Sequence, residues 1–491
     1  MDYSELPQPI EPVYSTDYPS KKIHLYEGEI KCSYKVNGNL YEFLGTGTIE
    51  YTWFPNPHPI FKISHSLFPI PHDLDDSNIT LPDSDRLIPI RIQNWANSHD
   101  RGKSIYHISG ALTGKSVVGR EDDLHSIIFH IVNFCEYINE VTCKQTEFGT
   151  TTNKGRITLF EEDWEIIIDE ASSKEKKSSD LFNDLKESGG YAITHAGKIK
   201  KKDNSTFSAE QAVKIIEILF HFLSFARGLH VPTVLLVGYN IAGEKVYEQW
   251  NDTFGNPWKS RDSWLPKQDL REVQTIFPKF VSWWKDWGQP AQIVLNMYIE
   301  ANTNDFGDIT IILTQSVLEL IARVVLVEKK SVVAAAQYDK RGFLSPAEKI
   351  THLLNEFSIS GTLKPSPNAS VDDLIQFVAD NIPESGYKNK SASEASIVFT
   401  KIRNDITHAK KQYTPSSIVL FNTMSLGLWY VEMVILAMIE YDGVYSNRLR
   451  RPKWAGEYDL VPWAEPRESE LPLVESIEAI IIPPDGEPLG N

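Results

Sequence analysis

The sequence contains few cysteines, the residues on which many structural metal sites depend. Only three of its 491 residues are cysteines, Cys32, Cys135 and Cys143, and they are scattered along the chain. They form no Cys-x-x-Cys pair and no other spacing typical of a metal site. We therefore expect a protein of a reducing, cytoplasmic compartment that holds no structural metal.

Other signals are missing as well. No uninterrupted apolar run reaches the ~18–20 residues needed to span a bilayer. The N-terminus, MDYSELPQPIEP, is acidic and contains prolines, unlike a secretory signal or a transit peptide. The sequence has no P-loop, no dinucleotide-type glycine fingerprint, no Gly-x-Ser-x-Gly elbow and no HExxH zinc helix. Nucleotide hydrolysis, hydride transfer and zinc proteolysis therefore have no support, and we expect no cofactor and no membrane association.

Basic charge is scarce across the chain. The 66 acidic residues outnumber the 49 basic ones, which gives a net charge of −17. A protein that coats nucleic acid with its whole surface would need the opposite balance. Within residues 401–411, however, one acid, Asp405, accompanies four basic residues: Lys401, Arg403, Lys410 and Lys411. This basic island fits a local phosphate site, and it fits a solvated helix end equally well.

Strand signals dominate the first part of the chain. Short apolar runs alternate with turns, and the dipeptide Asn37-Gly38 between two such runs predicts a hairpin. A helix is expected over residues 121–137, where apolar residues recur at helical spacing. Further strands are expected at four apolar runs: 164–170, 191–199, 231–240 and 244–250.

One helix in this region has clear end signals. Ser208 and Gln211 have the spacing of a capping box, and an apolar stripe continues from there to a terminating glycine, Gly228. We therefore predict a helix between these residues, within a β-rich domain.

The pattern changes to helices after about residue 290. Apolar stripes predict five helices, at 309–330, 345–357, 371–382, 391–411, and from Thr414-Pro415 to Gly443. Ser345, Pro346 and Glu348 mark the start of the second helix. The predicted class is α+β, with a β-rich mixed domain followed by an all-α bundle. The predicted divisions are an N-terminal extension (1–20), the β-rich domain (21–290), the bundle (291–450) and an acidic tail (451–491).

The motif RNDITH, residues 403–408, is the candidate for chemistry. Arginine and histidine at this spacing are expected about once by chance, and two further pairs occur, in RGKSIYH (101–107) and REDDLH (120–125). Only RNDITH lies in a basic setting at the end of a predicted bundle helix. Asn404 and His408, four apart, would share a helix face, while Arg403 offers donors to a phosphate. RNA cleavage normally needs two proton-transfer groups, and a twofold dimer would supply a second histidine.

The bundle resembles a HEPN domain, whose active members carry an arginine, a polar residue and then a histidine at this spacing. Within that family the sequence is most similar to the ApeA-type group. The similarity includes TQSVLELI, which places a family-typical acid at Glu319. Upstream, it includes the runs YAITHAGKI, FSAEQAVKIIEILFHFLSFARG and VPTVLLVGYNIAGEKVYEQW. The resemblance covers most of residues 20–450.

The resemblance implies a metal-independent endoribonuclease of bacterial anti-phage abortive infection. Such a protein would act as a dimer or larger oligomer on RNA, with tRNA or another host RNA as substrate. Arg403, His408 and Asn404 would be catalytic and Glu319 would support them. Lys401, Lys410 and Lys411 would bind the RNA. The N-terminal domain would receive a phage-derived activator.

Other interpretations stay open. The bundle can instead be a non-catalytic adaptor or dimerisation module with a structural Arg–His pair, or it can bind nucleotides. Glu319 lies on an apolar helix and can equally be a structural acid. Several other residues that attract notice are expected to belong to the core or to domain packing: His195, His221, His230, Trp283, Trp284 and Trp287.

Overall fold

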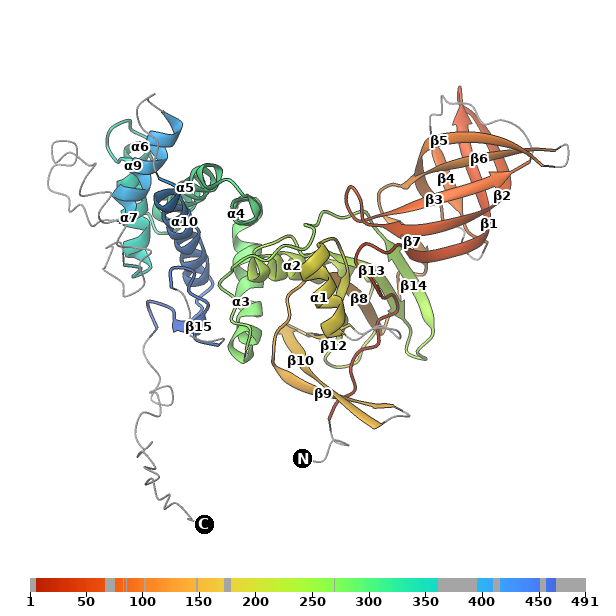
Figure 1. The fold of residues 1–491 in the computed structure, drawn as a ribbon, viewed down its shortest axis with the longest axis horizontal. Coiled ribbons are helices and arrows are strands. Elements are labelled where there is room, and N and C mark those ends of the chain that lie inside the picture. The colour runs from red at the N-terminus through yellow and green to blue at the C-terminus, as the bar shows by residue number, and fades with distance from the viewer. Residues whose placement is uncertain are drawn as a thin grey trace, which may run out of the picture.

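The computed structural model describes residues 6–66, 76–82, 84, 86–100, 103–146, 149–171, 178–268, 270–360, 395–408, 416–450 and 456–464. A closed barrel, an eight-stranded sheet and a helical bundle follow one another along the chain and in space, with the sheet between the other two (Figure 1). The predicted α+β class, β-rich first and helical afterwards, is confirmed. The predicted helix 371–382, the tail from residue 465, Lys410 and Lys411 lie outside the described residues.

The barrel is the first unit. Its strands pair in the order β1-β2-β3-β6-β5-β4, and β4 closes it against β1. The predicted hairpin is confirmed, because Asn37 and Gly38 join β1 to β2 with φ angles of 52° and 79°. The apolar core of the barrel, which contains Tyr51 and Trp53, continues into the sheet unit, where Tyr191 and Trp250 belong to the same cluster. The strands are β1 (Ile23–Val36), β2 (Asn39–Thr52), β3 (His58–His65), β4 (Ser77–Thr80), β5 (Ile88–Asp100) and β6 (Lys103–Leu112).

The central sheet is antiparallel throughout, in the order β7-β14-β13-β8-β12-β11-β10-β9. The four strands predicted beyond residue 160 are confirmed as β11, β12, β13 and β14. The elements of this unit are β7 (Ser116–Gly119), β8 (Ser126–Val132), β9 (Glu140–Thr146), β10 (Gly149–Glu161), β11 (Trp164–Glu170), α1 (Ser178–Ser188), β12 (Ile193–Lys201), α2 (Ala209–Arg227), β13 (Thr233–Tyr239) and β14 (Lys245–Trp250).

The helix predicted over residues 121–137 is wrong. This segment contains β8, which pairs with β12 on one side and β13 on the other. All but one of its seven residues are buried, so its sequence SIIFHIV is an apolar run rather than an alternating one. Such a run fits both a central strand that is covered on both faces and a segment of a buried helix, so the apolar pattern alone does not distinguish them. The β-branched isoleucines and valine favour the strand.

Helix α2 has the ends that the sequence predicts. The Ser208 side chain accepts a hydrogen bond from the Gln211 backbone N–H, and the Gln211 side chain accepts one from the Ser208 backbone N–H. Gly228 ends the helix in the left-handed conformation, with φ of 68°. The helix lies on the sheet and belongs to the same apolar core.

The bundle follows the sheet. Helices predicted at 309–330 and 345–357 are confirmed as α5, with its π-helical continuation η2, and α7, which has the predicted capping box at Ser345. The last helix begins after Ser416 and ends at Met438, inside its predicted limits. The elements are α3 (Arg271–Trp287), α4 (Gln289–Thr303), α5 (Gly307–Arg323), η2 (Val324–Lys329), α6 (Ala335–Tyr338), α7 (Pro346–Glu356), α9 (Ala395–Thr407), α10 (Ser417–Met438), β15 (Val444–Tyr445) and β16 (Asp459–Leu460).

Two bundle segments, Gly307–Lys329 and Ser417–Met438, are long and apolar enough to cross a membrane by length and composition alone. More than half of each is buried here, because α5 and α10 pack along each other in the core of the bundle.

The N-terminal extension is part of the sheet unit. Residues 7–20, which we call the N-terminal strap, donate and accept hydrogen bonds along it. The backbone N–H of Tyr14 donates to His130 Nε2 over 3.0 Å, and that of Ile10 donates to an Asp169 carboxylate oxygen over 2.7 Å. The Thr16 hydroxyl accepts from the Ile193 N–H over 2.8 Å.

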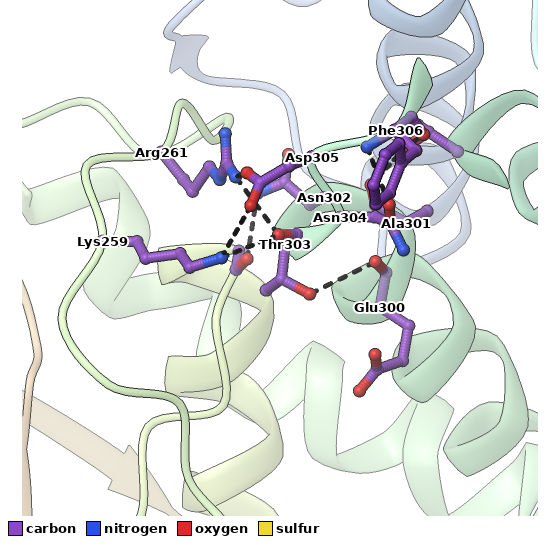
Figure 2. A network of polar contacts seen from close by, with 11 residues as sticks. Lys259, Arg261, Glu300, Ala301, Asn302, Thr303, Asn304, Asp305 and Phe306 are labelled. Atoms are coloured by element: carbon purple, nitrogen blue, oxygen red, sulfur yellow. Dashed lines mark hydrogen bonds and ion pairs between the residues drawn. The ribbon is translucent and has the colours of Figure 1, made fainter. Parts of the chain in front are cut away.

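A polar clasp joins the sheet unit to the bundle. Lys259 and Arg261, from the loop after β14, converge on Asp305 just beyond α4 (Figure 2). Arg261 also donates to the Thr303 carbonyl over 3.2 Å. Beside them, the Asn302 amide donates to the carbonyls of Gly228 and Asp262, so the end of α2 and the end of α4 are held together.

Candidate functional site

The RNDITH motif lies at the C-terminal end of α9. Arg403 and Asn404 are half-buried in its last turns, and His408 is exposed immediately after it. Arg403 Nη1 donates to Asn404 Oδ1 over 3.1 Å, and the His408 backbone N–H donates to the Asn404 carbonyl over 2.9 Å. The asparagine side chain therefore holds the guanidinium, while the imidazole faces outward.

Arg403 has an unfilled hydrogen-bonding position. Its Nε is buried and has no partner among the described residues. A buried donor without a partner is costly, so this position favours a further acceptor. Thr400 on α9, Gln315 on α5 and Asn422 on α10 each carry a further buried polar atom without a partner in the described part of the protein.

These three helices meet closely. Gly427 of α10 lies against the Phe399 ring of α9 and the Thr314 hydroxyl of α5, and an added Cβ would stand 2.6 Å from each. The absence of a side chain at Gly427 lets α9 sit deep between the other two helices. This packing fixes the direction in which the end of α9, with its arginine and histidine, leaves the bundle.

Two other residues of the predicted site, Lys401 and Glu319, bond to partners on their own helices. Lys401 forms an ion pair with Asp405 one turn along the same helix, and the carboxylate partly neutralises the positive charge that the lysine would offer to an RNA. Glu319 is half-buried on α5 and accepts a hydrogen bond from Gln315 Nε2 over 2.7 Å. Among the described residues, no hydrogen bond or ion pair joins Glu319 to Arg403 or His408. Burial and the nearby Glu319 carboxylate raise the pKa of Tyr338 to about 12.

Exposed apolar side chains gather where α5 and α10 begin. Gly307 lies against Leu420 and Met424, so the first turns of the two helices are neighbours. We define the apolar rim as Phe306, Ile309, Ile418 and Phe421, which are 67%, 41%, 54% and 58% exposed. Its α10 residues, Ile418 and Phe421, follow His408 closely in the chain. The rim was missed from the sequence because its residues belong to the same apolar runs as the helix cores.

The other candidates lie in structural positions. His107, the histidine of the RGKSIYH pair, lies between the hydroxyls of Ser64 and Ser98 in the barrel, at 2.8 Å from each. His195 is fully buried and stacked on Tyr137, and burial lowers its pKa to about 3. Trp283 and Trp287 are buried in the core shared by α2 and the bundle, as expected for packing between units. Across the described ranges, no group of three or more histidine, cysteine or acidic side chains is arranged to hold a metal ion.

Comparison with known proteins shows similarity to YopA proteins. Residues 119–261 match the YopA central domain, and residues 284–460 match the YopA C-terminal domain. The SPbeta prophage-derived uncharacterized protein YopA of Bacillus subtilis (strain 168) is 29% identical over 360 residues, which cover 72% of this chain and 76% of that protein. No solved structure matches significantly. The two matches correspond to the sheet unit and the bundle, and the barrel precedes them. The resemblance to ApeA-type HEPN proteins stays a prediction.

Proposed function

We propose that this protein is a metal-independent endoribonuclease of bacterial anti-phage defence, with its reaction centre at RNDITH. The observation that carries the proposal is the end of α9, where an exposed imidazole, His408, follows a guanidinium, Arg403, whose buried Nε has no partner among the described residues. Guanidinium groups bind phosphate oxygens through paired donors, and imidazole exchanges protons near neutral pH. The similar Bacillus subtilis protein is described as prophage-derived, which supports a role in conflict between phages and their hosts.

The proposed reaction uses two histidines and no metal. One His408 takes the proton of a ribose 2′-hydroxyl as that oxygen attacks the neighbouring phosphorus. A second His408 gives a proton to the departing 5′-oxygen. Arg403 stabilises the negative charge that develops on the phosphoryl oxygens. The products are a 2′,3′-cyclic phosphate and a free 5′-hydroxyl.

Each chain supplies one His408, so the mechanism requires a symmetric pair of chains. The apolar rim is the surface that would bring them together, because contiguous exposed apolar side chains mark protein contacts. Two of its residues, Ile418 and Phe421, lie on α10, ten and thirteen residues after His408 along the chain. A twofold pairing through the rim would place the two histidines near the same axis.

Cleavage of a defined RNA in the presence of a chelator tests the proposal. His408→Ala and Arg403→Ala should each lower the rate by about 100-fold or more, the usual contribution of a proton-transfer or charge-stabilising group. His352→Ala and Arg341→Ala, exposed residues of the same type in the bundle, should leave the rate unchanged. The RNA fragments should carry cyclic phosphate ends.

A second candidate is a non-catalytic adaptor, favoured by the bond between Arg403 and Asn404, which gives the arginine a structural partner. The same assay separates the two functions. If His408→Ala cleaves as fast as the unchanged protein, or if the folded dimer cleaves no RNA, the nuclease proposal fails. In cells, fragments mapped after phage infection should depend on His408 and would identify the RNA target.

A further inference from the structure

Two serines flank the imidazole of His107 on the barrel. Ser64 Oγ lies 2.8 Å from its Nδ1, and Ser98 Oγ lies 2.8 Å from its Nε2. The three residues come from β3, β6 and β5, which are neighbours in the barrel (Figure 1). Ser64 and His107 stand directly opposite each other on β3 and β6, so the strand register sets the distance between them.

The two contacts give the imidazole two different roles. A neutral imidazole has one nitrogen that accepts a hydrogen bond and one N–H that donates, and a hydroxyl can do either. With Nδ1 as the acceptor, the Ser64 hydroxyl donates to His107, and His107 Nε2–H donates to Ser98. A serine bonded to a histidine that a third group orients is the usual arrangement of an activated nucleophile.

A cavity of about 220 Å³ opens beside Ser64. Ile63 and His65 are buried inside the barrel, so Ser64, between them on the strand, faces outward. Ser64 and His107 both line the cavity, whereas Ser98 is not part of its described lining. A bound molecule would therefore reach Ser64. The volume is below the roughly 300–1,000 Å³ of sites for drug-sized ligands, so it suits a small substrate.

Two hydrogen-bond donors stand in the wall of this cavity. Lys62 lies two residues before Ser64 and on the same face of β3. Its ammonium is 3.7 Å from the Glu50 carboxylate, which is longer than a hydrogen bond. Asn94 of β5 donates to Ser109 over a long 3.5 Å. Both donors are placed to turn toward a negatively charged oxygen that forms beside Ser64.

We propose that Ser64 and His107 hydrolyse small carboxylic esters, with Ser98 as a positioning residue. Ser64 Oγ bonds to the carbonyl carbon of the ester as its proton passes to His107 Nδ1. The bond from that carbon to the alcohol oxygen then breaks, and the alcohol leaves with the proton. A water oxygen next bonds to the acyl carbon and gives a proton to His107. That proton passes to Ser64 Oγ as the acyl bond breaks, which releases the carboxylic acid.

Labelling of the full chain with an alkyl fluorophosphonate tests the nucleophile. The phosphorus should bond to Ser64 Oγ while fluoride departs and the serine proton passes through His107 to water. Mass spectrometry of the digested protein should find the label on the peptide that contains Ser64. This reaction does not depend on RNDITH or on the proposed nuclease activity.

Hydrolysis of p-nitrophenyl acetate tests the complete reaction. Ser64→Ala and His107→Gln should each lower the rate by about 100-fold or more, the usual contribution of a proton-transfer group. Ser98→Ala should lower kcat roughly fivefold, the effect of one neutral hydrogen bond, and leave KM unchanged. Ser98→Thr, which keeps a hydroxyl, should restore kcat.

The barrel contains a matched control. Ser104 Oγ lies 3.3 Å from His99 Nε2, and neither residue is part of the described lining of the cavity. Ser104→Ala and His99→Gln should keep the full rate and the full label, which excludes general reactivity of serines and histidines on the barrel surface. Melting of each variant shows that it is folded.

Three results would overturn the proposal. The first is no labelling of the unchanged protein, and the second is a label on another serine in place of Ser64. The third is hydrolysis by His107→Gln as fast as by His99→Gln.

Discussion

His130 lies in the middle of the central sheet and has both ring nitrogens engaged. Its Nδ1 donates to the Leu235 carbonyl over 2.9 Å, and its Nε2 accepts from the Tyr14 N–H over 3.0 Å. Only the neutral ring can donate on one side and accept on the other. Burial lowers its pKa to about 4, and a protonated ring would lose the bond to the N-terminal strap.

This arrangement predicts a loss of stability in mild acid. The unfolded chain takes up the His130 proton below its ordinary pKa of about 6.5, whereas the folded chain does so only near pH 4. The free energy of unfolding should therefore fall as the pH drops from about 6.5 toward 4, by on the order of 2 kcal/mol at pH 5 for this residue. His130→Gln should flatten this dependence in chemical denaturation measured across the range. His24→Gln, at an exposed position, should leave the slope unchanged; a wild-type slope in His130→Gln would contradict the assignment.

At the same scale, the sequence located the candidate site but not its contacts. Arg403, Asn404 and His408 lie together at a helix end, as the spacing predicts. The sequence did not show that the asparagine side chain binds the arginine, because that choice depends on rotamers and neighbouring helices. That Glu319 bonds to Gln315, and among the described residues not to the motif, depends in turn on which face of α5 packs against α9.

Among the elements, α2 was predictable because its signals are local. A capping box, an apolar stripe and a terminal glycine all agree with the same helix. Strand β8 was not predictable, because its apolar run fits two structures and pairing with β12 and β13 decides between them. For the same reason the closure of β4 against β1, which makes the barrel, depends on residues far apart in the chain.

The end of α2 offers a prediction at this scale. Gly228 has a positive φ, and a Cβ added there would stand 2.4 Å from Asn302 Nδ2. Gly228→Ala should thus lose about 1–2 kcal/mol from the backbone alone and more from displacing Asn302. Gly243→Ala, at φ of 78° with open space around it, should lose only the backbone part. Equal losses in chemical denaturation would mean that the contact between α2 and α4 contributes nothing.

At the scale of the whole molecule, one buried ion pair ties the bundle to the loop after β14. Glu432 of α10 is fully buried and accepts hydrogen bonds from Arg448 Nε over 2.9 Å and the Tyr298 hydroxyl over 2.6 Å. Arg448 also donates to the Asp262 carbonyl over 3.1 Å. The pair thereby connects α10, α4 and the loop that carries the clasp.

Removing one member of this pair should destabilise the whole chain. Arg448→Met leaves the Glu432 charge buried without its partner and should lower the free energy of unfolding by about 3–5 kcal/mol. Adding Glu432→Gln should restore part of that loss. Lys214→Met, which breaks the exposed and solvent-screened pair with Glu210, should leave the stability nearly unchanged. Thermal and denaturant unfolding measure all three, and a small effect of Arg448→Met would show that water reaches Glu432.

The apolar rim gives a prediction about assembly. Phe306→Glu/Phe421→Glu should shift the protein from dimer to monomer in sedimentation and abolish RNA cleavage, because charges would face each other across the axis. Ile241→Glu changes a more exposed apolar residue of the sheet unit and should alter neither property. A double variant that stays dimeric and active would place the contact between chains elsewhere.

The N-terminal strap sets an order of events during synthesis. Its Tyr14 donates through the backbone to His130 and through the hydroxyl to Glu248, so these partners are made 116 and 234 residues later. The barrel can close while the ribosome is still translating the sheet. The strap leaves the ribosome before these partners exist and is consequently fixed only after them, and a proteolytic cut before the barrel would leave Asp169, His130 and Glu248 of the finished sheet without their strap contacts.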